Sequence, residues 1–284
     1  MLCRLLFACK RVVRSAASCA IAILFALCAC CVTPVHAGSI FIAGHDPDFH
    51  AVIGYNAPGA RHFNQVAIHY ILDPAFNSFA STAHKFLYVE SNIDTPPGHT
   101  RGTDGIVASG FALGVDFEQH DASTLNAQLD SLGTKYSGIV VASDYGACLT
   151  QAELDILNAR VNDIVAFLNT GGGIYAMAES NHGAELTPGG GHFGFLPSVI
   201  SSIPGDEFEI DYSLSPFGTS LGLTLDDIND NVRHNVFNEF AARIHDLSAV
   251  DYDTHGQVIS LAGRSFVTVA RPVTWGAIKA LYAR

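Results

Sequence analysis

Short apolar runs alternate with segments of helical periodicity through the first two thirds of the chain. This alternation is the pattern of a parallel β-sheet whose two faces are covered by helices. The apolar runs are nearly continuous, as expected for strands that have no polar face. The sequence therefore predicts an α/β fold with a mostly parallel, doubly wound sheet. The predicted strands are residues 40–43, 86–89, 115–119, 138–142 and 173–177.

Four helical segments lie between or beside these strands. They are residues 62–72, 104–113, 123–132 and 151–169. The last segment has the clearest boundaries, because Thr150 and Glu153 form a capping-box pattern and Gly171 ends the apolar periodicity. After Asn181 the chain becomes rich in glycine and proline, which indicates an elaboration of the same domain that includes a hairpin. The strands of that hairpin are predicted at residues 247–252 and 258–261.

The first 37 residues have the pattern of an export signal. Basic residues precede an apolar run, and Val35, His36 and Ala37 form a small-x-small cleavage site. We therefore expect cleavage near Ala37 and a secreted protein in the periplasm or outside the cell. Two alternatives stay open, namely a membrane anchor that is not removed and a lipoprotein processed near Cys30. The basic residues of this leader are Arg4, Lys10, Arg11 and Arg14.

Cysteine usage separates the leader from the rest of the chain. Six of the seven cysteines lie in the leader, at positions 3, 9, 19, 28, 30 and 31. Only Cys148 remains after cleavage, so no internal disulfide can form and the apolar core has to hold the fold. A chain of this length can bury roughly 70% of its unfolded surface. We therefore expect one domain over residues 38–265, followed by a C-terminal tail over residues 266–284 that is too short in apolar span for a membrane helix.

Charge limits the partners that this protein can have. The whole chain has a formal net charge of −12, and loss of the four basic leader residues would make it −16. A strongly acidic protein is repelled by nucleic acid and by anionic membranes. The sequence thus predicts no nucleic-acid partner and no membrane partner after cleavage.

Polar side chains follow each predicted strand. Ligands of open parallel sheets bind outside the carboxyl ends of the strands, so these positions are the candidate binding residues. The strongest candidates are His45, Asp46, Asp48, His50, Asp144, Glu179 and Asn181. Glu90, His120, Asp121 and His182 also follow strands at this edge.

The segments "GIVVASDYG" and "GGGIYAMAESN" resemble the class I glutamine amidotransferase-like fold, which is a flavodoxin-like architecture. The segments "FIAGHDPDFHA", "VVASDYGACLTQAELDILNAR" and "GGGIYAMAESN…GGGHFGFLP" resemble a group of exported, PEP-CTERM-associated bacterial proteins of unknown function. The Pro-Glu-Pro sorting tail of that group has no counterpart in this chain. The resemblance implies a flavodoxin-like sheet over about residues 39–181.

In active members of that superfamily a cysteine nucleophile follows the strand that corresponds to residues 173–177. The resemblance places Ala178 at this position. Alanine cannot form a covalent intermediate, so we expect neither amidotransferase nor cysteine-peptidase activity. Cys148 lies in a different loop, just before a predicted helix, and is interpreted as a small half-buried residue rather than a second nucleophile.

The segment Gly44–His50, "GHDPDFH", is a candidate metal site. His45, Asp48 and His50 could supply nitrogen and oxygen ligands to Zn²⁺ or a similar divalent cofactor. The alternative is a polar turn, since aspartate beside proline is common in turns and the spacing matches no strong metal motif. His192, in a glycine-rich segment, is a further candidate ligand-binding residue.

Three functions are compatible with these residues. The first is an exported, non-catalytic α/β domain that binds a small molecule, a glycan or a matrix component at the carboxyl edge of the sheet. The second is a hydrolase that uses a metal or a carboxylate pair in the same place, with Glu179 as the candidate base. The third is a structural protein of the envelope or matrix.

Overall fold

The structure of the 284-residue chain is a computed structural model. It describes residues 38–54, 56–83, 85–91, 102–144, 148–179, 193–196, 202–208, 210–230, 232–237 and 247–264. The chain divides into two compact units, Met1–Val35 and His36–Arg284, and all described residues belong to the second. The predicted signal peptide and the predicted C-terminal tail lie outside the described residues.

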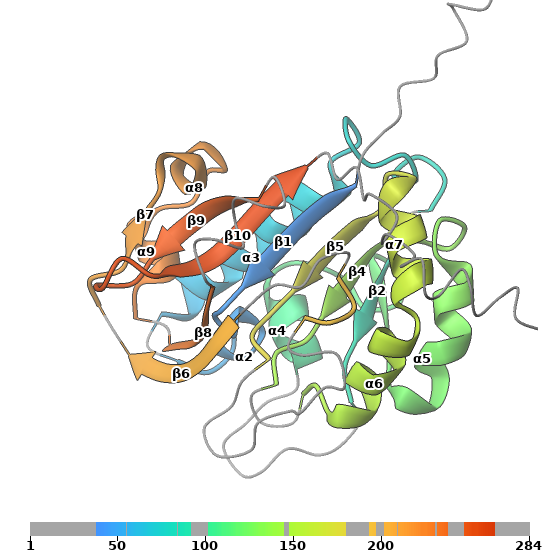
Figure 1. The fold of residues 1–284 in the computed structure, drawn as a ribbon, viewed down its shortest axis with the longest axis horizontal. Coiled ribbons are helices and arrows are strands. Elements are labelled where there is room, and N and C mark those ends of the chain that lie inside the picture. Colours follow the sequence, from blue (N-terminus) through green and yellow to red (C-terminus); the bar gives the residue numbers. More distant parts are fainter. Residues whose placement is uncertain are drawn as a thin grey trace, which may run out of the picture. The chain divides into compact units, whose positions relative to one another are not determined.

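A mixed sheet forms the centre of the second unit, with the strand order β3-β2-β4-β5-β1-β10-β8-β6 (Figure 1). Its first five strands in sequence pair only in parallel with one another. These strands are β1 (Ser39–Ala43), β2 (Lys85–Val89), β3 (Phe117–His120), β4 (Tyr136–Val141) and β5 (Gly173–Ala176). The predicted α/β class is confirmed, and so is the interior position of β1 and β5, each of which has a strand on both sides.

The C-terminal part of the chain continues this sheet in antiparallel fashion. Strand β10 pairs with β1, β8 pairs with β10, and β6 pairs with β8. The predicted hairpin is confirmed as the antiparallel pair of β9 and β10. The strands are β6 (Ser202–Phe208), β7 (Ser213–Leu214), β8 (Val232–Phe237), β9 (Ser248–Tyr252) and β10 (Val258–Arg264). The elaboration is thus an extension of the same sheet and lies against β1.

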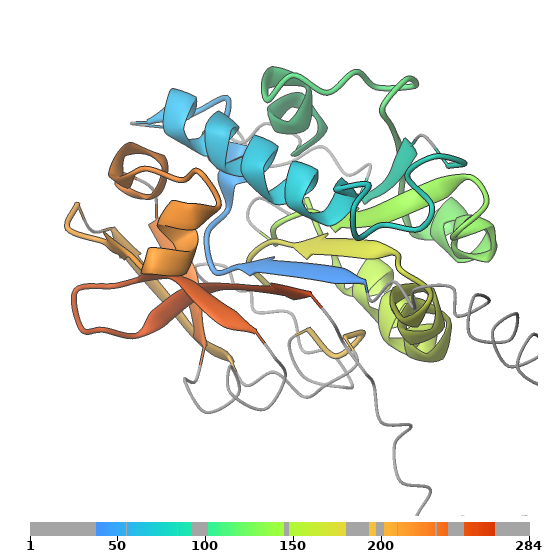
Figure 2. The ribbon, with the colours of Figure 1, turned by 90° about the horizontal axis from the view of Figure 1, so that it is seen from above.

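Helices cover both faces of the parallel strands (Figure 2). On one face lie α3 and α4, and on the opposite face lie α6 and α7. Their bounds are α2 (Pro47–His50), α3 (Ala57–Leu72), α4 (Gly102–Ala108), α5 (Ala122–Gln128), α6 (Gln151–Ala159), α7 (Val161–Asn169), α8 (Pro216–Ser220) and α9 (Leu225–Ile228), with a 3₁₀ turn at Leu129–Ser131. In the described residues, no helix is both long enough and apolar enough to cross a membrane.

Several predicted elements differ from the structure. The predicted helix 62–72 begins at Ala57, and the predicted helix 123–132 ends at Gln128 and continues as a 3₁₀ turn. The predicted helix 104–113 ends at Ala108, because Gly110 has a left-handed φ of 97° that terminates it. The predicted strand 115–119 begins only at Phe117, because Asp116 accepts a hydrogen bond from the Ala112 N–H (2.7 Å) and closes a turn. These shifts are local and leave the sheet order unaffected.

The predicted helix 151–169 is two helices, α6 and α7, that meet at Arg160. Arg160 leaves the helical region, with φ −98° and ψ 17°. Its guanidinium donates to the Asn126 carbonyl (2.9 Å) and forms ion pairs with Asp130 and Asp163 (2.5 Å each). The predicted capping box at the start is present, since the Thr150 N–H donates to Glu153 Oε2 (3.1 Å).

Candidate functional site

Three loops meet at the carboxyl edge of the parallel strands. The Ala178 N–H donates to the His45 carbonyl (3.1 Å), and the Asp144 N–H donates to the Ala178 carbonyl (2.8 Å). These bonds join the chain segments that follow β1, β4 and β5. The predicted proximity of "GHDPDFH" to Asp144 and Glu179 is therefore present in the backbone.

The segment "GHDPDFH" is a buried helical turn. Pro47 occupies the first turn of α2, where its missing N–H leaves no hydrogen bond unmade. The Asn64 side chain donates to the Pro47 carbonyl (2.9 Å) and ties α2 to α3. On the other side, a Cβ on Gly105 would lie only 1.7 Å from the Asp48 carbonyl oxygen, so α4 can pack here only with glycine. In the structure, this segment is therefore a buried turn packed against α3 and α4.

Asp46 joins α2 to β8 through two histidines. His50 Nε2 lies 3.2 Å from Asp46 Oδ1, and His234 Nε2 lies 3.3 Å from Asp46 Oδ2. Burial by itself raises the pKa of Asp46, but the charges of His50 and His234 outweigh it and hold that pKa below its usual value. Burial lowers the pKa of His50, and the Asp46 charge outweighs this effect and raises it. When His50 or His234 is protonated, the cluster is an ion pair held inside the protein.

Two further buried pairs involve the C-terminal strands. His45 Nε2, just after β1, lies 2.8 Å from Asp251 Oδ2 of β9, and Arg233 Nη2 of β8 lies 3.3 Å from Asp253 Oδ2, just after β9. The Gly44 carbonyl accepts hydrogen bonds from the N–H groups of His234 (2.7 Å) and Asn235 (3.1 Å). The segment after β1 is thus tied to both β8 and β9.

Asp48 and Glu90 are buried carboxyl groups on neighbouring segments. Asp48 Oδ2 accepts from the Ser143 N–H (2.9 Å) and the Tyr88 hydroxyl (3.2 Å), and burial raises the pKa of Asp48 despite these bonds. Glu90 Oε2 accepts from the backbone N–H (3.0 Å) and the hydroxyl of Thr103. Burial raises the pKa of Glu90 to about 7, although the bonds from Thr103 oppose the rise.

Glu179 is the buried carboxyl group directly after the candidate elbow. Its Oε2 accepts from the Phe193 N–H (2.6 Å), and its backbone N–H donates to Asn235 Oδ1 (2.8 Å). Burial raises the pKa of Glu179 to about 8, the Phe193 bond opposes the rise, and the nearby Asp144 adds to it. A carboxyl group in this state stays protonated near neutral pH and can donate a hydrogen bond.

Neither Ala178 nor Cys148, the two positions considered for a nucleophile, offers one in the structure. Ala178 is only 1% exposed, and both of its backbone polar groups are hydrogen-bonded. Cys148 is equally buried. Burial is the main cause that raises the pKa of its thiol far above the usual range, and the charges of Asp48 and Glu90 add to the rise. A thiol held neutral in this way is a poor nucleophile.

We predict that the Cys148 thiol does not react with Ellman's reagent in the folded, leader-free protein and reacts fully after unfolding in urea. The reason is its burial and its raised pKa. A Thr219→Cys variant supplies the control, because Thr219 lies exposed on α8. Equal reaction rates for Cys148 and for the control thiol would contradict the structure.

Metal ligation by His45, Asp48 and His50 finds no support in the geometry. The three side chains contact different partners, namely Asp251, Ser143 and Asp46. Among the residues that the structure describes, no three His, Cys, Asp or Glu side chains are grouped so that they could hold a metal ion. Asn181 and His192 lie outside the described residues, so their predicted roles stay predictions.

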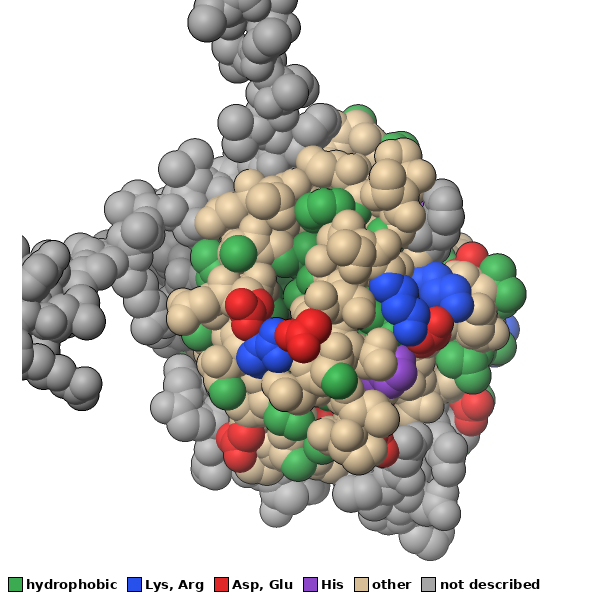
Figure 3. Space-filling view, turned by 90° about the vertical axis from the view of Figure 1, so that its right-hand side faces the viewer, with side chains coloured by type: hydrophobic (Ala, Val, Ile, Leu, Met, Phe, Trp, Pro, Cys, Tyr) green, Lys and Arg blue, Asp and Glu red, His purple; other side chains and the backbone are tan. Residues whose placement is uncertain are grey.

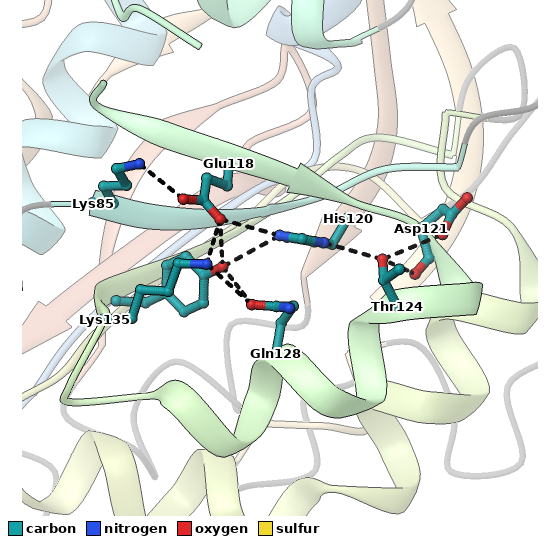
Figure 4. Close-up of polar contacts among 8 residues, drawn as sticks. Lys85, Glu118, His120, Asp121, Thr124, Gln128 and Lys135 are labelled. Atoms are coloured by element: carbon teal, nitrogen blue, oxygen red, sulfur yellow. Dashed lines mark hydrogen bonds and ion pairs between the residues drawn. The ribbon is translucent and has the colours of Figure 1, made fainter. Parts of the chain in front are cut away.

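His120, which is the last residue of β3 rather than a residue after it, belongs to a separate network at the open edge of the sheet (Figure 4). Glu118 is its centre and contacts Lys85 (2.8 Å), Lys135 (2.5 Å) and His120 Nε2 (3.4 Å). The hydrogen bonds from Lys135 and then Lys85 lower the pKa of Glu118 to about 2. Charged side chains on an edge strand discourage pairing with another chain. We interpret this network as protection of the β3 edge.

Several residues of the buried cluster were not predicted from the sequence. They are Arg233, His234 and Asn235 of β8 and Asp251 and Asp253 of the β9 region. The sequence feature that could have identified them is the run of three consecutive polar residues, 233–235, inside an extended segment. Long-range antiparallel pairing brings them to the carboxyl edge, and no local pattern encodes that pairing.

Seen from the right-hand side of Figure 1, basic and acidic side chains lie in mixed clusters (Figure 3). On that view the described surface has no large patch of a single charge. Comparisons of the chain with protein-family models, with curated proteins and with solved structures found no match.

Proposed function

We propose that the chain is an exported, non-catalytic α/β domain that binds a small molecule, a glycan or a matrix component at the carboxyl edge of its parallel strands. The observation that carries the proposal is a set of three buried carboxyl groups at this edge whose pKa values burial raises. Burying such groups costs stability, and groups of this kind collect at functional sites. They are Asp48, Glu90 and Glu179.

The strand order supports the same location. Ligands of doubly wound sheets bind at the point where the strand order reverses, that is, between two neighbouring strands whose following connections run to opposite sides of the sheet. Here β3 lies on one side of β2 and β4 lies on the other, so this point falls between β2 and β4. Glu90 follows β2, and Ser143, which binds Asp48, follows β4. Because these carboxyl groups are covered, binding has to uncover them, and the measured affinity includes that cost.

The states of Ala178 and Cys148 support binding without covalent catalysis. Ala178 stands where the resembled superfamily has its cysteine, and Cys148 is held as a neutral thiol.

The proposal includes the class I glutamine amidotransferase-like fold. The flavodoxin-like strand order is 2-1-3-4-5. If β2 is counted as the first strand, the order β3-β2-β4-β5 matches the first four places, and β1 occupies the fifth place.

A second candidate is a hydrolase that works through the carboxyl groups. The observation that favours it is the pair of pKa values near neutrality, about 7 for Glu90 and about 8 for Glu179. Groups that titrate near the working pH are suited to general acid and base catalysis.

The test is a panel of neutral oligosaccharides and matrix polysaccharides, titrated calorimetrically into protein that has been exported by its own leader. We expect saturable binding without bond cleavage, and an N-terminus near Gly38 in the same preparation. Glu179→Ala should weaken binding at least tenfold, which corresponds to one lost hydrogen bond to a charged or strongly polar group. Glu118→Ala is the matched control, because Glu118 lies in the surface network on β3.

Cleavage of a panel member that is abolished by Glu90→Gln would replace the binding proposal with the hydrolase. Binding that survives Glu179→Ala unchanged would remove the carboxyl edge as the site. An N-terminus at a lipid-modified Cys30 would replace free secretion with the lipoprotein alternative.

A further inference from the structure

A groove lies at the amino edge of the parallel strands, opposite to the candidate site. Ser39, the first residue of β1, pairs with Arg264 of β10, and the groove runs over this end of β10 between α3 and α8. Its volume is about 820 Å³. Sites for small molecules span roughly 300–1,000 Å³. The groove is therefore large enough for a ligand, at an edge of the sheet that the proposed function does not use.

The charge in the groove lining is already balanced. Among the described residues that line it, Arg264 and Asp73 are the only Arg, Lys, Asp or Glu, and they pair with each other at 2.9 Å. Arg264 also donates to the Tyr70 carbonyl (3.2 Å), and its guanidinium lies over the rings of Tyr70 (4.2 Å) and Phe76 (3.8 Å). A charged ligand would have to compete with this pair, so the lining favours a neutral ligand.

The polar groups of the lining retain hydrogen-bonding capacity. Arg264 uses Nη2 for both Asp73 and the Tyr70 carbonyl, so Nη1 is left to donate to a ligand. Ser220 Oγ donates to the Phe217 carbonyl (2.6 Å) and can still accept. His69 and Ser248 are exposed and add an imidazole ring and a hydroxyl group. These groups come from α3, α8, β9 and β10, so they can bond to one ligand from several sides.

Apolar side chains lie in the same lining as these polar groups. Val66 and Leu72 of α3 and Phe217 of α8 are half-buried and line the groove. A sugar ring has hydroxyl groups around its rim and C–H groups on its two faces. Ligand sites commonly combine apolar walls with a few polar groups that fix the orientation of the ligand. A mixed lining with balanced charge therefore matches a neutral saccharide better than an ion or an apolar chain.

We propose that the groove between α3 and α8 is a second binding site, which takes a neutral oligosaccharide. The C–H faces of the sugar rings lie against Val66 and Phe217. Their hydroxyl groups bond to Arg264 Nη1, Ser220 Oγ and Ser248 Oγ. The proposal is independent of the proposed function, because the groove shares no residue with Asp48, Glu90 and Glu179 of the carboxyl edge.

The test is a titration of the exported, leader-free protein with cellotriose, maltotriose and mannotriose, followed by calorimetry and by backbone amide NMR. We expect saturable binding of at least one trisaccharide, with amide shifts at Ser248 and Gly263. Ser220→Tyr fills the groove and should weaken this binding at least tenfold. Thr219→Tyr is the matched control, since Thr219 is the exposed neighbour on α8 and does not line the groove.

A second variant keeps the test decisive if Ser220→Tyr fails to fold. His69→Ala removes an exposed ring from the groove wall and should weaken binding roughly tenfold. His255→Ala, in the exposed turn between β9 and β10, should leave binding unchanged.

The position of the amide shifts separates the two sites. Shifts confined to Ser143 and Glu179 overturn the groove and leave the carboxyl edge as the binding site. Shifts confined to the groove support this inference and count against the carboxyl edge. The groove is also overturned if none of the three trisaccharides binds, or if Ser220→Tyr and His69→Ala bind as tightly as their controls.

Discussion

Replacing Asp46 by Asn is expected to lower the free energy of unfolding by roughly 3–5 kcal/mol at pH 5.5, the cost of removing one partner from a buried ion pair. Asp46 is fully buried, and its two carboxylate oxygens face His50 (3.2 Å) and His234 (3.3 Å). An asparagine in this place leaves protonated histidine buried without a counter-charge. Urea denaturation with linear extrapolation measures the difference.

The pH dependence of this loss follows from the two pKa shifts. The pKa of Asp46 is lowered in the folded state, so its contribution is present above the unfolded value of about 3.8 and is lost as the pH falls below it. The pKa of His50 is raised, so its contribution is complete below 6.5 and is lost as the pH rises through the folded value. The difference between the two proteins should therefore be largest between about pH 4 and 6.5 and smaller at pH 9.

Asp211→Asn is the control for the same chemical change, because Asp211 is exposed. It should alter stability by about 0.5 kcal/mol or less, as surface substitutions usually do. A loss for Asp46→Asn that is equally small, or that is the same at pH 5.5 and pH 9, would show that the cluster is not an ion pair.

Replacing Glu179 by Gln is expected to stabilise the protein at pH 9 by roughly 3–5 kcal/mol, at about 1.4 kcal/mol for each unit of pKa shift. The pKa of Glu179 is raised from 4.5 to about 8 by burial. Between these values the folded protein keeps a proton that the unfolded chain has lost, so the stability of the wild type falls as the pH rises. Glutamine resembles the protonated carboxyl group and has no proton to lose.

At pH 5 the two proteins should have similar stability, because Glu179 is protonated in the folded wild type and glutamine can still accept from the Phe193 N–H. Urea denaturation at pH 5 and pH 9 measures both values. Glu118→Gln is the control with the same chemical change, and it should give no stabilisation at pH 9 because the pKa of Glu118 is lowered. A Glu179→Gln variant that is less stable than the wild type at both pH values would refute the assignment.

The outcome also bears on function. A group whose neutral replacement improves stability, and whose removal weakens ligand binding, is kept for function at the expense of stability. Glu179→Gln tests the first effect and Glu179→Ala tests the second. If Glu179→Ala leaves binding intact, the carboxyl group does not serve the ligand.

Local sequence patterns predicted most of the parallel half of the fold. Continuous apolar runs identified β1, β2, β4 and β5, because strands covered on both faces have no polar side. The same reasoning predicted which segments meet at the carboxyl edge, since parallel strands deliver their following loops to one side. The break between α6 and α7 was not predictable, because apolar residues keep helical spacing on both sides of Arg160.

The sequence by itself determined the α/β class, the buried strands and the candidate residues around His45, Asp144 and Glu179, because each depends on periodicity or on position after a strand. Only the tertiary structure decided the partners of those residues. His45 faces Asp251, Asp46 faces His234, and Glu179 binds Asn235 and Phe193. The physical reason is that the contacts with Asp251, His234 and Asn235 depend on β8 and β9, whose antiparallel pairing joins segments far apart in the chain and leaves no periodic pattern in it.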